Sequence, residues 1–318
     1  MRVSTHPKSS NSTDRPASRL MARGNGWAVW DVVCTSGPFS RPFEEKHSCP
    51  AVAIVMAGTF QYQSGAGREL MTPGSILLGN SGQCYECGHE HGVGDRCVSF
   101  SYAPEYFDRL TADAGASIGE RRFRALRLPP LRDLSPLIAH TSATLACRDE
   151  AYPLLSARAV ASRTSAGQGE LPRAGDTTAV SGWEELAIRL AAQAVQLDRG
   201  IRAESVHAQP GAEARVTRTV RRIEAHPEEH NDLASLAHEA RLSPYHFLRT
   251  FEALTGVTPH QYLLRIRLRH AAIRIRTESA RILDIALDCG FGDVSNFNRT
   301  FRAEFGVSPR AYRMRTAV

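Results

Sequence analysis

A sixteen-residue segment near the C-terminus occurs twice, and its two copies start fifty residues apart. Phe247–Tyr262 reads FLRTFEALTGVTPHQY and Phe297–Tyr312 reads FNRTFRAEFGVSPRAY. Nine of the sixteen positions are identical without a gap, which predicts two copies of one supersecondary unit. Two copies are too few for a solenoid, which needs at least three stacked repeats. We therefore expect a pair of equivalent elements that contact two equivalent places on one partner.

The first copy lies in a pattern typical of two short helices joined by a tight turn. Asp232 is the predicted N-cap of the first helix, and Arg241-Leu242 is the predicted turn. Ser243 and Pro244 favour the start of a second helix, as N-cap and first helical residue, and Gly256 favours its end. This is the helix-turn-helix arrangement, whose second helix, the recognition helix, enters the major groove of DNA.

The second copy follows the same order of signals. Ile282–Leu287 predicts the supporting helix, Cys289–Gly292 the turn, and Asp293 the N-cap of a recognition helix that ends at Gly306. Between the copies, the apolar spacing of Thr258–Thr277 predicts one long helix. A rigid helix there would hold the two recognition helices about one DNA turn, roughly 34 Å, apart.

The net charge of the chain belongs to the same segment. Seventeen arginines and eleven acidic residues lie between Arg215 and the C-terminus, whereas the rest of the chain has 22 basic and 22 acidic residues. A basic surface favours association with phosphate backbones, and a solvated surface without a partner is the alternative. Arg265, Arg267 and Arg269, on the long helix between the copies, are expected to contact phosphates or to be solvated.

A longer motif runs through the second copy. Its residues are Asp284-Ile285-Ala286, Cys289-Gly290-Phe291, Asp293, Ser295, Phe297, Arg299, Phe301, Gly306 and Ser308-Pro309-Arg310-Ala311-Tyr312-Arg313. This motif resembles the signature of the AraC/XylS family of bacterial transcription regulators, and the resemblance covers roughly residues 213–318. It implies two helix-turn-helix motifs that read adjacent major grooves from one face of double-stranded DNA. It also implies a regulator rather than an enzyme, with RNA polymerase as a further partner.

The predicted base contacts lie near the start of each recognition helix, opposite its buried phenylalanines. They are Tyr245, His246 and Arg249 in the first helix, and Val294, Ser295, Asn296, Asn298 and Arg299 in the second. Arginine binds guanine O6 and N7, asparagine suits adenine, and valine suits the thymine methyl group, each worth roughly 1–3 kcal/mol of discrimination. Arg249 and Arg299 could instead bind phosphate or fix the fold, and His246 could be an ordinary surface residue.

Short β-branched and aromatic segments separated by Gly and Pro predict strands in the first third of the chain. They are Trp27–Val33, Ala51–Met56, Thr59–Tyr62, Ser75–Leu78 and Arg96–Tyr102. Short strands at even spacing favour a small barrel or jelly roll, and Leu70–Leu78 resembles the turn into a strand found in cupin-like barrels. We therefore predict a two-domain α+β protein, with a cupin-like sensor barrel at 26–130 and an all-α DNA-binding domain at 215–318.

The other segments complete the predicted organisation. Residues 1–25 have no apolar signal-peptide core and read as a disordered tail, so a cytoplasmic location is the default, and no apolar run predicts a membrane span. A helical support region is predicted at 131–200, with a flexible insert at about 156–182, and a linker at 201–214. Its amphipathic helix Trp183–Leu197 could mediate a homodimer or pack against the protein's own barrel.

Five soft or borderline metal ligands lie within fourteen residues of the predicted barrel. They are Cys84, Cys87, His89, His91 and Cys97. A Cys-x-x-Cys pair with a nearby histidine can bind zinc or iron, or form a reversible disulfide. Because strand residues point alternately to opposite faces, all five cannot converge, and free cysteines are often only packing groups. The two histidines resemble a cupin His-x-His pair, but no obvious downstream Glu and His complete that set.

The predicted effector of the N-terminal domain is therefore a small molecule, a metal or a redox state. An enzymatic alternative also exists, because DNA-repair regulators with a zinc-bound, methyl-accepting cysteine carry the same kind of DNA-binding domain. The chain lacks a second Cys-x-x-Cys at a suitable separation, which argues against that alternative.

Overall fold

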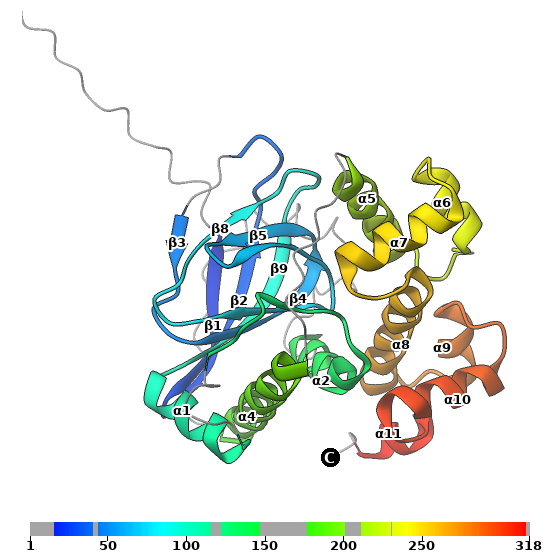
Figure 1. The fold of residues 1–318 in the computed structure, drawn as a ribbon. Coiled ribbons are helices and arrows are strands. Elements are labelled where there is room, and N and C mark those ends of the chain that lie inside the picture. The colour runs from blue at the N-terminus through cyan, green and yellow to red at the C-terminus, as the bar shows by residue number, and fades with distance from the viewer. Residues whose placement is uncertain are drawn as a thin grey trace, which may run out of the picture.

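The structure, a computed structural model, describes residues 16–40, 44–115, 122–146, 177–200, 211–229 and 231–315. A β-rich N-terminal unit (residues 16–200) lies beside a helical C-terminal unit (residues 211–315) (Figure 1). The strands are β1 (Ala17–Gly24), β2 (Trp27–Cys34), β3 (Glu44–Lys46), β4 (Ala51–Gly58), β5 (Phe60–Ser64), β6 (Gly67–Met71), β7 (Ile76–Gly79), β8 (Cys84–Gly88), β9 (Asp95–Tyr102) and β10 (Arg127–Leu128).

Helices follow the strands and fill the C-terminal unit. They are α1 (Pro104–Asp113), the 3-10 turn η2 (Arg132–Leu134), α2 (Ser135–Ala146), α4 (Thr177–Gly200), α5 (Ala212–Ala225), α6 (Leu233–Glu239), α7 (Pro244–Thr255), α8 (Pro259–Thr277), α9 (Ile282–Asp288), α10 (Val294–Phe305) and α11 (Pro309–Arg315). None of these described helices combines the length and the apolarity needed to cross a lipid bilayer.

The described strands form two open sheets rather than one closed barrel. The larger sheet has the order β1-β2-β9-β4-β7-β10, and the smaller has the order β3-β8-β5-β6. The chain passes between them several times, for example where β4 runs into β5 and where β8 connects to β9. The predicted β-rich unit is therefore observed, but the predicted closure into a cupin-like barrel is not confirmed.

Strand β4 is buried at all of its eight positions because both faces of the larger sheet are covered. Val52, Ile54 and Met56 pack in one core with side chains of α1, α2 and α4. Ala53 and Val55 pack in another core with side chains of the smaller sheet. Alternation of side chains along a strand thus divides the N-terminal unit into three layers, with the larger sheet in the middle (Figure 1).

Helix α4 packs against this sheet with the apolar face that the sequence predicts. Its Trp183, Leu186 and Leu190 are buried in the core that also contains β4. Of the two predicted roles of this helix, packing against the protein's own sheet is the one that the described contacts support.

Three predicted segment boundaries are wrong at their edges. Ala17–Gly24, part of the predicted tail, is strand β1, because it forms a hairpin with β2 that pairs Gly24 with Trp27. Residues 177–182 of the predicted insert belong to α4, and residues 212–214 of the predicted linker belong to α5. The rest of the predicted tail, insert and linker lies outside the described residues, except Pro16 and Asn25 on either side of β1 and Gly211 at the start of α5.

The capping signals of both helix-turn-helix units are confirmed. Asp232, Ser243 and Asp293 each accept a hydrogen bond from the backbone N–H three residues later. Gly256 and Gly306 end the two recognition helices, α7 and α10, in the left-handed conformation that glycine adopts without strain.

The two turns differ by one residue but use the same backbone geometry. Arg241 has φ 53° after α6, and Gly290 has φ 85° after α9. The following residues, Leu242 and Phe291, donate their backbone N–H to Ala237 and Ala286 respectively, at 3.0 and 3.1 Å. This is the hydrogen bond of a Schellman end, so each supporting helix closes in the same way.

Apolar contacts join the two units. Leu70 of β6 is buried in the core of the first helix-turn-helix, and Ala139 of α2 is buried in the core of the second. In the opposite direction, Ile273 of α8 is buried in the core beneath the larger sheet. Each of these three cores thus contains a side chain from the neighbouring unit.

Polar contacts at this junction involve the C-terminal ends of both recognition helices. Arg127 donates to the carbonyl oxygen of Thr255, at the end of α7, at 2.9 Å. Arg132 donates to the carbonyl oxygen of Ala303, and the Ser135 hydroxyl donates to Glu304, both near the end of α10. Residues 127–135, the contact segment, therefore touch both recognition helices at the ends opposite to the predicted base contacts.

A buried carboxyl group also lies at the junction. Glu224 of α5 is 5% exposed and accepts a hydrogen bond from the backbone of Gly58. Burial raises the pKa of Glu224 to about 8, although the charges of Arg221 and Arg269 act to lower it. A carboxyl that is neutral when folded and charged when unfolded makes stability depend on pH.

We expect Phe297→Ala to lower the free energy of unfolding by about 3–5 kcal/mol. The Phe297 ring is fully buried, and its centroid lies 5.0 Å from that of Phe291 and 5.4 Å from that of Phe301. Denaturant titration followed by circular dichroism measures the loss. Phe39→Ala is the matched control because the Phe39 side chain is fully exposed, and equal losses in the two variants would contradict the packing described.

We expect the contribution of Glu224 to stability to fall as pH rises from about 4.5 to about 8, because Glu224 keeps its proton in the folded state over this range and releases it on unfolding. Glu224→Gln removes that proton release. Between about pH 6 and about pH 9, the melting temperature of the unchanged protein should therefore fall more than that of the variant. Parallel curves for the two proteins would show that Glu224 is not responsible.

Candidate functional site

The predicted base-contacting residues lie on the outer faces of α7 and α10. Tyr245, His246 and Arg249 are exposed, while Phe247 and Phe251 of the same helix are buried. In α10 the buried residues are likewise phenylalanines, Phe297 and Phe301. The exposed ones are Ser295, Asn296, Asn298 and Arg299, and Val294 is partly buried.

Three of these side chains are oriented by their neighbours. Arg299 donates to the Asn296 side-chain oxygen at 3.1 Å, so these two polar side chains lie together on the surface of α10. His246 Nδ1 lies 2.9 Å from the Ser243 hydroxyl, which already accepts from the His246 backbone N–H. Ser243 therefore has its hydroxyl hydrogen to donate to Nδ1, which leaves Nε2 as the outward-facing nitrogen.

Three of the five arginines of α8 were expected to contact phosphates or to be solvated, and all three have contacts within the protein. Arg265 lies 3.5 Å from the Glu304 carboxylate, and Arg267 donates to the carbonyl oxygens of Pro227 and Glu229. Arg269 is 5% exposed at the junction of the two units. The expectation of a solvated or phosphate-binding group is therefore wrong for Arg269, which is buried, whereas Arg265 and Arg267 are partly exposed and already have partners within the protein.

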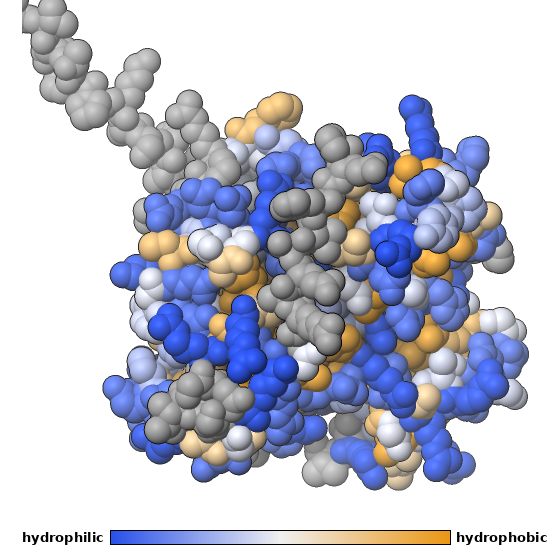
Figure 2. Space-filling view, in the orientation of Figure 1, coloured by the Kyte–Doolittle hydropathy of each residue, from blue (hydrophilic) through white to orange (hydrophobic). Residues whose placement is uncertain are grey.

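The surface over α10 is mainly hydrophilic, as the lower right of Figure 2 shows. Its exposed arginines include Arg299, Arg302 and Arg310, and Arg299 and Arg302 lie on one side of α10. An exposed basic surface next to exposed amides suits a polar, negatively charged partner.

The five predicted metal ligands of the N-terminal unit do not converge. Cys84 is exposed, whereas Cys87, three residues later on β8, lines the space between the sheets. His89 and Cys97 line the same space, but His91 lies outside it, near Glu90 and Glu213. The alternation of side chains along β8 separates Cys84 from the others, as expected.

A pocket of about 180 Å³ lies between the two sheets. Its lining includes Val32, Cys34, Glu45, His47, Ala51, Ala53, Phe60, Leu77, Tyr85, Cys87, His89, Asp95, Cys97 and Ser99. Ala51, Ala53 and Ser99 are small residues at positions that face the smaller sheet, and they leave this space open.

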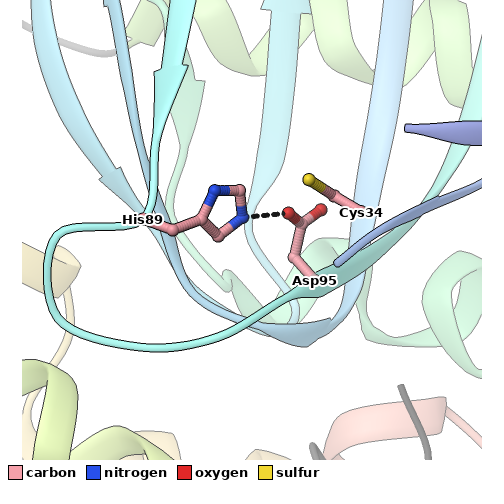
Figure 3. A group of neighbouring side chains, drawn as sticks. All are labelled: Cys34, His89 and Asp95. Atoms are coloured by element: carbon pink, nitrogen blue, oxygen red, sulfur yellow. Dashed lines mark hydrogen bonds and ion pairs between the residues drawn. The ribbon is translucent and has the colours of Figure 1, made fainter. Parts of the chain in front are cut away.

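Strand pairing brings an unpredicted group of side chains together at one end of the pocket. Cys34 of β2 is directly opposite Asp95 of β9, and directly opposed residues of antiparallel strands share one face. Cys97 is two residues after Asp95 and lies on the same face. His89 enters from the connection between β8 and β9, and its Nε2 lies 2.6 Å from Asp95 Oδ1 (Figure 3). The ligand atoms of Cys34, His89 and Asp95 lie within 4.8 Å of one another.

The electrostatics of this group follow from burial and hydrogen bonding. Burial lowers the pKa of His89, but hydrogen bonds to Asp95 and Cys34 outweigh it and raise the pKa to about 9. Burial, together with the charge of Asp95, raises the pKa of the Cys87 and Cys97 thiols well above their usual value. A thiol with a raised pKa is a poor nucleophile at neutral pH, so neither has the character of an activated redox cysteine.

The opposite end of the pocket carries a second polar group. His47 Nε2 lies 2.8 Å from the Tyr62 hydroxyl, and the His47 ring stacks on Tyr85 at a centroid distance of 4.2 Å. Tyr85 in turn donates to Glu45. Burial lowers the pKa of His47 to about 4, so this imidazole is neutral at physiological pH.

Helix α5 contacts the connection that carries His89. Arg221 donates to the carbonyl oxygens of Val93 and Gly94 at 3.2 and 3.3 Å, and to the Thr59 hydroxyl at 3.1 Å. Residues 89–94, the pocket loop, are thus bound directly by the first described helix of the C-terminal unit. The Arg221 guanidinium lies so close to Gly92 that a side chain there would collide with it.

Cys34, Asp95 and Arg221 were not predicted as site residues. Cys34 and Asp95 are 61 positions apart, and only the pairing of β2 with β9 brings them together. Helix α5 has a sequence signal that was missed, since Val216, Val220 and Ile223 have helical spacing and are all buried.

Comparison with known proteins supports the reading of the C-terminal unit. Residues 236–315 match a family model described as a helix-turn-helix domain. The HTH-type transcriptional activator RhaR of Yersinia pseudotuberculosis serotype O:3 is 39% identical over 84 residues, which are 26% of this chain and 29% of that protein. The activator RhaS of Citrobacter koseri is 38% identical over 101 residues, which are 32% of this chain and 36% of that protein.

Solved structures match about a third of the chain. The DNA-binding domain of the transcriptional factor AdpA, in complex with a target DNA, is 32% identical and covers 31% of this chain and 90% of that chain, with a TM-score of 0.31. An AraC-type regulator from Chromobacterium violaceum is 30% identical and covers 34% of this chain and 97% of that chain, also with a TM-score of 0.31.

The chain spans about a third of the length of the curated relatives it matches. Those relatives are named as transcription regulators and not as enzymes, which agrees with the sequence-based expectation. The repeat, the caps and the comparisons lead to one assignment: residues 236–315 form a helix-turn-helix domain that is similar in sequence to HTH-type transcriptional activators.

Proposed function

We propose that the protein is a transcription regulator whose C-terminal unit binds a promoter and whose N-terminal unit senses an effector. The observation that carries the DNA-binding part is the duplicated recognition helix. In α7 and α10 alike, buried phenylalanines fix one face to the core and polar residues occupy the exposed face near the helix start. That is the geometry with which a helix-turn-helix reads a major groove.

The base contacts follow from the side chains at those positions. Arg249 and Arg299 would bind guanine, Asn296 or Asn298 would bind adenine, and Val294 would contact a thymine methyl group. Tyr245, His246 and Ser295 complete the proposed surface. The single helix α8 joins the two helix-turn-helix motifs, so the motifs would read two adjacent turns of double-stranded DNA.

The sensing part rests on the pocket between the sheets and on what touches it. An effector in this pocket would lie against His89, which begins the pocket loop, and against Asp95, which follows its last residue. Arg221 binds that loop and belongs to α5, whose Val216 and Val220 pack in the core of the first helix-turn-helix. A ligand shifts the populations of two states only when it binds one of them better. An effector that prefers one position of the pocket loop would therefore shift the position of α5.

The effector class stays open among a small molecule, a metal ion and a redox state. The two facing sheets with a pocket between them are the arrangement on which we base the proposal that the N-terminal unit is cupin-like. We further propose a cytoplasmic location, where bacterial promoters are, and RNA polymerase as a partner, since the curated relatives are named activators. A homodimer would need a surface other than the covered face of α4.

DNA binding is tested by selecting preferred sequences from randomised duplexes with the full chain. We expect one preferred site with two half-sites about one DNA turn apart, and affinity that falls with salt in proportion to the phosphates contacted. Selection of no sequence at any salt concentration would overturn the proposed function.

Within that site, Arg299→Ala should relax the preference at one base pair by about 1–3 kcal/mol and leave the other positions unchanged. Competition binding with single-base variants of the site measures this. Arg189→Ala, an exposed arginine on α4, is the matched control and should leave the preferences intact. An equal loss of affinity for all sequences in Arg299→Ala would assign Arg299 to the phosphates instead of a base.

A further inference from the structure

We propose that the pocket between the sheets is a binding site for a single thiophilic divalent cation, Zn²⁺, with Cys34, His89 and Asp95 as its protein ligands. This set differs from the Cys-x-x-Cys cluster that the sequence suggests. It names an effector class for the sensor, and only its regulatory consequence rests on the proposed function.

The donor atoms match the chemistry of zinc. One thiol sulfur, one imidazole nitrogen and one carboxylate oxygen, all within 4.8 Å, are the three atom types that zinc binds. A mixed sulfur and nitrogen set disfavours Mg²⁺ and Ca²⁺, which prefer oxygen ligands alone. All three residues are at most 7% exposed, so the ion would be shielded from bulk water.

The fold fixes two of the three ligands before any ion arrives. Cys34 and Asp95 are directly opposed residues in the middle layer of the N-terminal unit. A site built on paired strands holds its ligands more precisely than a site on loops alone. His89 is the adjustable ligand, because it lies at the start of the pocket loop.

Binding requires one small local movement. His89 Nε2 and Asp95 Oδ1 lie 2.6 Å apart as hydrogen-bond partners. Two ligands at zinc distances of about 2.0–2.2 Å in tetrahedral geometry lie about 3.3 Å apart, so the imidazole must move away from the carboxylate. His89 begins the pocket loop, and Arg221 binds the other end of that loop.

Three protein ligands leave a fourth position on the ion. The nearest further ligand atom is Cys97 Sγ, which lies 3.4 Å from Asp95 Oδ2. Cys97 lines the same pocket. A site with three protein ligands keeps its fourth position for water or a small molecule, and this position would face the cavity.

The other group of potential ligands in the described residues is a poorer candidate. Glu90, His91 and Glu213 also have ligand atoms within 4.8 Å of one another, but Glu90 is exposed and the other two are only partly buried. Arg68 forms ion pairs with both carboxylates, so they already have a cationic partner.

The test uses the full-length protein, stripped with a chelator, reloaded with Zn²⁺ and desalted, with bound metal measured by mass spectrometry. We expect one equivalent in the unchanged protein and in Cys84→Ser, whose exposed thiol lies outside the pocket. We expect no retained zinc in Cys34→Ser or in Asp95→Asn. Retention of one equivalent in both pocket variants, or its loss in Cys84→Ser, would overturn the assignment.

A measurement on the unchanged protein keeps the proposal testable if the pocket variants fail to fold. Co²⁺ bound to Cys34 gives a thiolate-to-metal charge-transfer band that Zn²⁺ abolishes by competition. The absence of that band at saturating Co²⁺ would overturn the proposal.

Duplex binding by the same preparations separates this inference from the proposed function. A protein that selects DNA but binds no metal keeps its role as a regulator and loses this site. A protein that binds one zinc but selects no DNA keeps the site and loses the regulatory role. If both hold, affinity for the selected duplex should differ between the zinc-loaded and the chelator-treated protein.

Discussion

Helix α8 supplies side chains to three hydrophobic cores, and the arrangement of the molecule depends on it. Tyr262, Leu263 and Ile266 lie in the core of the first helix-turn-helix. Leu268, Ala272 and Ile275 lie in the core of the second, and Ile273 reaches the core beneath the larger sheet. Apolar side chains on different sides of a helix are stabilised only when each side is covered, so α8 requires all three neighbours to be in place.

Packing of α8 against three neighbours also explains why two of its arginines serve internal contacts. Their guanidinium groups lie among packed elements, where an unpaired charge is costly. Arg265 meets Glu304, and Arg267 meets backbone carbonyl oxygens. A basic composition in the C-terminal segment is therefore partly structural, and only the exposed arginines contribute to attraction for phosphates.

The parts of the fold that depend on local chemistry could be predicted from the sequence. The N-caps Asp232, Ser243 and Asp293 and the terminating Gly256 and Gly306 act through residues within one turn of themselves, so the ends of the helices were predictable. The strand edges were less so, since β1 has no continuous apolar pattern and is defined by its pairing with β2.

The pocket could not be predicted, because its members meet only through long-range pairing. Cys84 and Cys87 are close in sequence, but they occupy opposite faces of β8. Cys34 is distant in sequence, but the register of β2 with β9 places it opposite Asp95. Spacing along a chain identifies a ligand set only where the backbone is a turn or a single helix face, and this site is neither. Of the predicted cluster, His89 and Cys97 belong to the observed group.

The contact segment has a consequence for the modularity of the protein. Arg127, Arg132 and Ser135 belong to the N-terminal unit, yet they bind the ends of α7 and α10. The relative placement of the two recognition helices is thus shared between α8 and a part of the chain that precedes residue 201. A chimera in which a foreign sensor replaces the N-terminal unit would keep both recognition helices intact but would lose these restraints on their spacing. Exchange of sensors between such proteins would therefore have to conserve the geometry of this segment as well as the sequence of the DNA-binding domain.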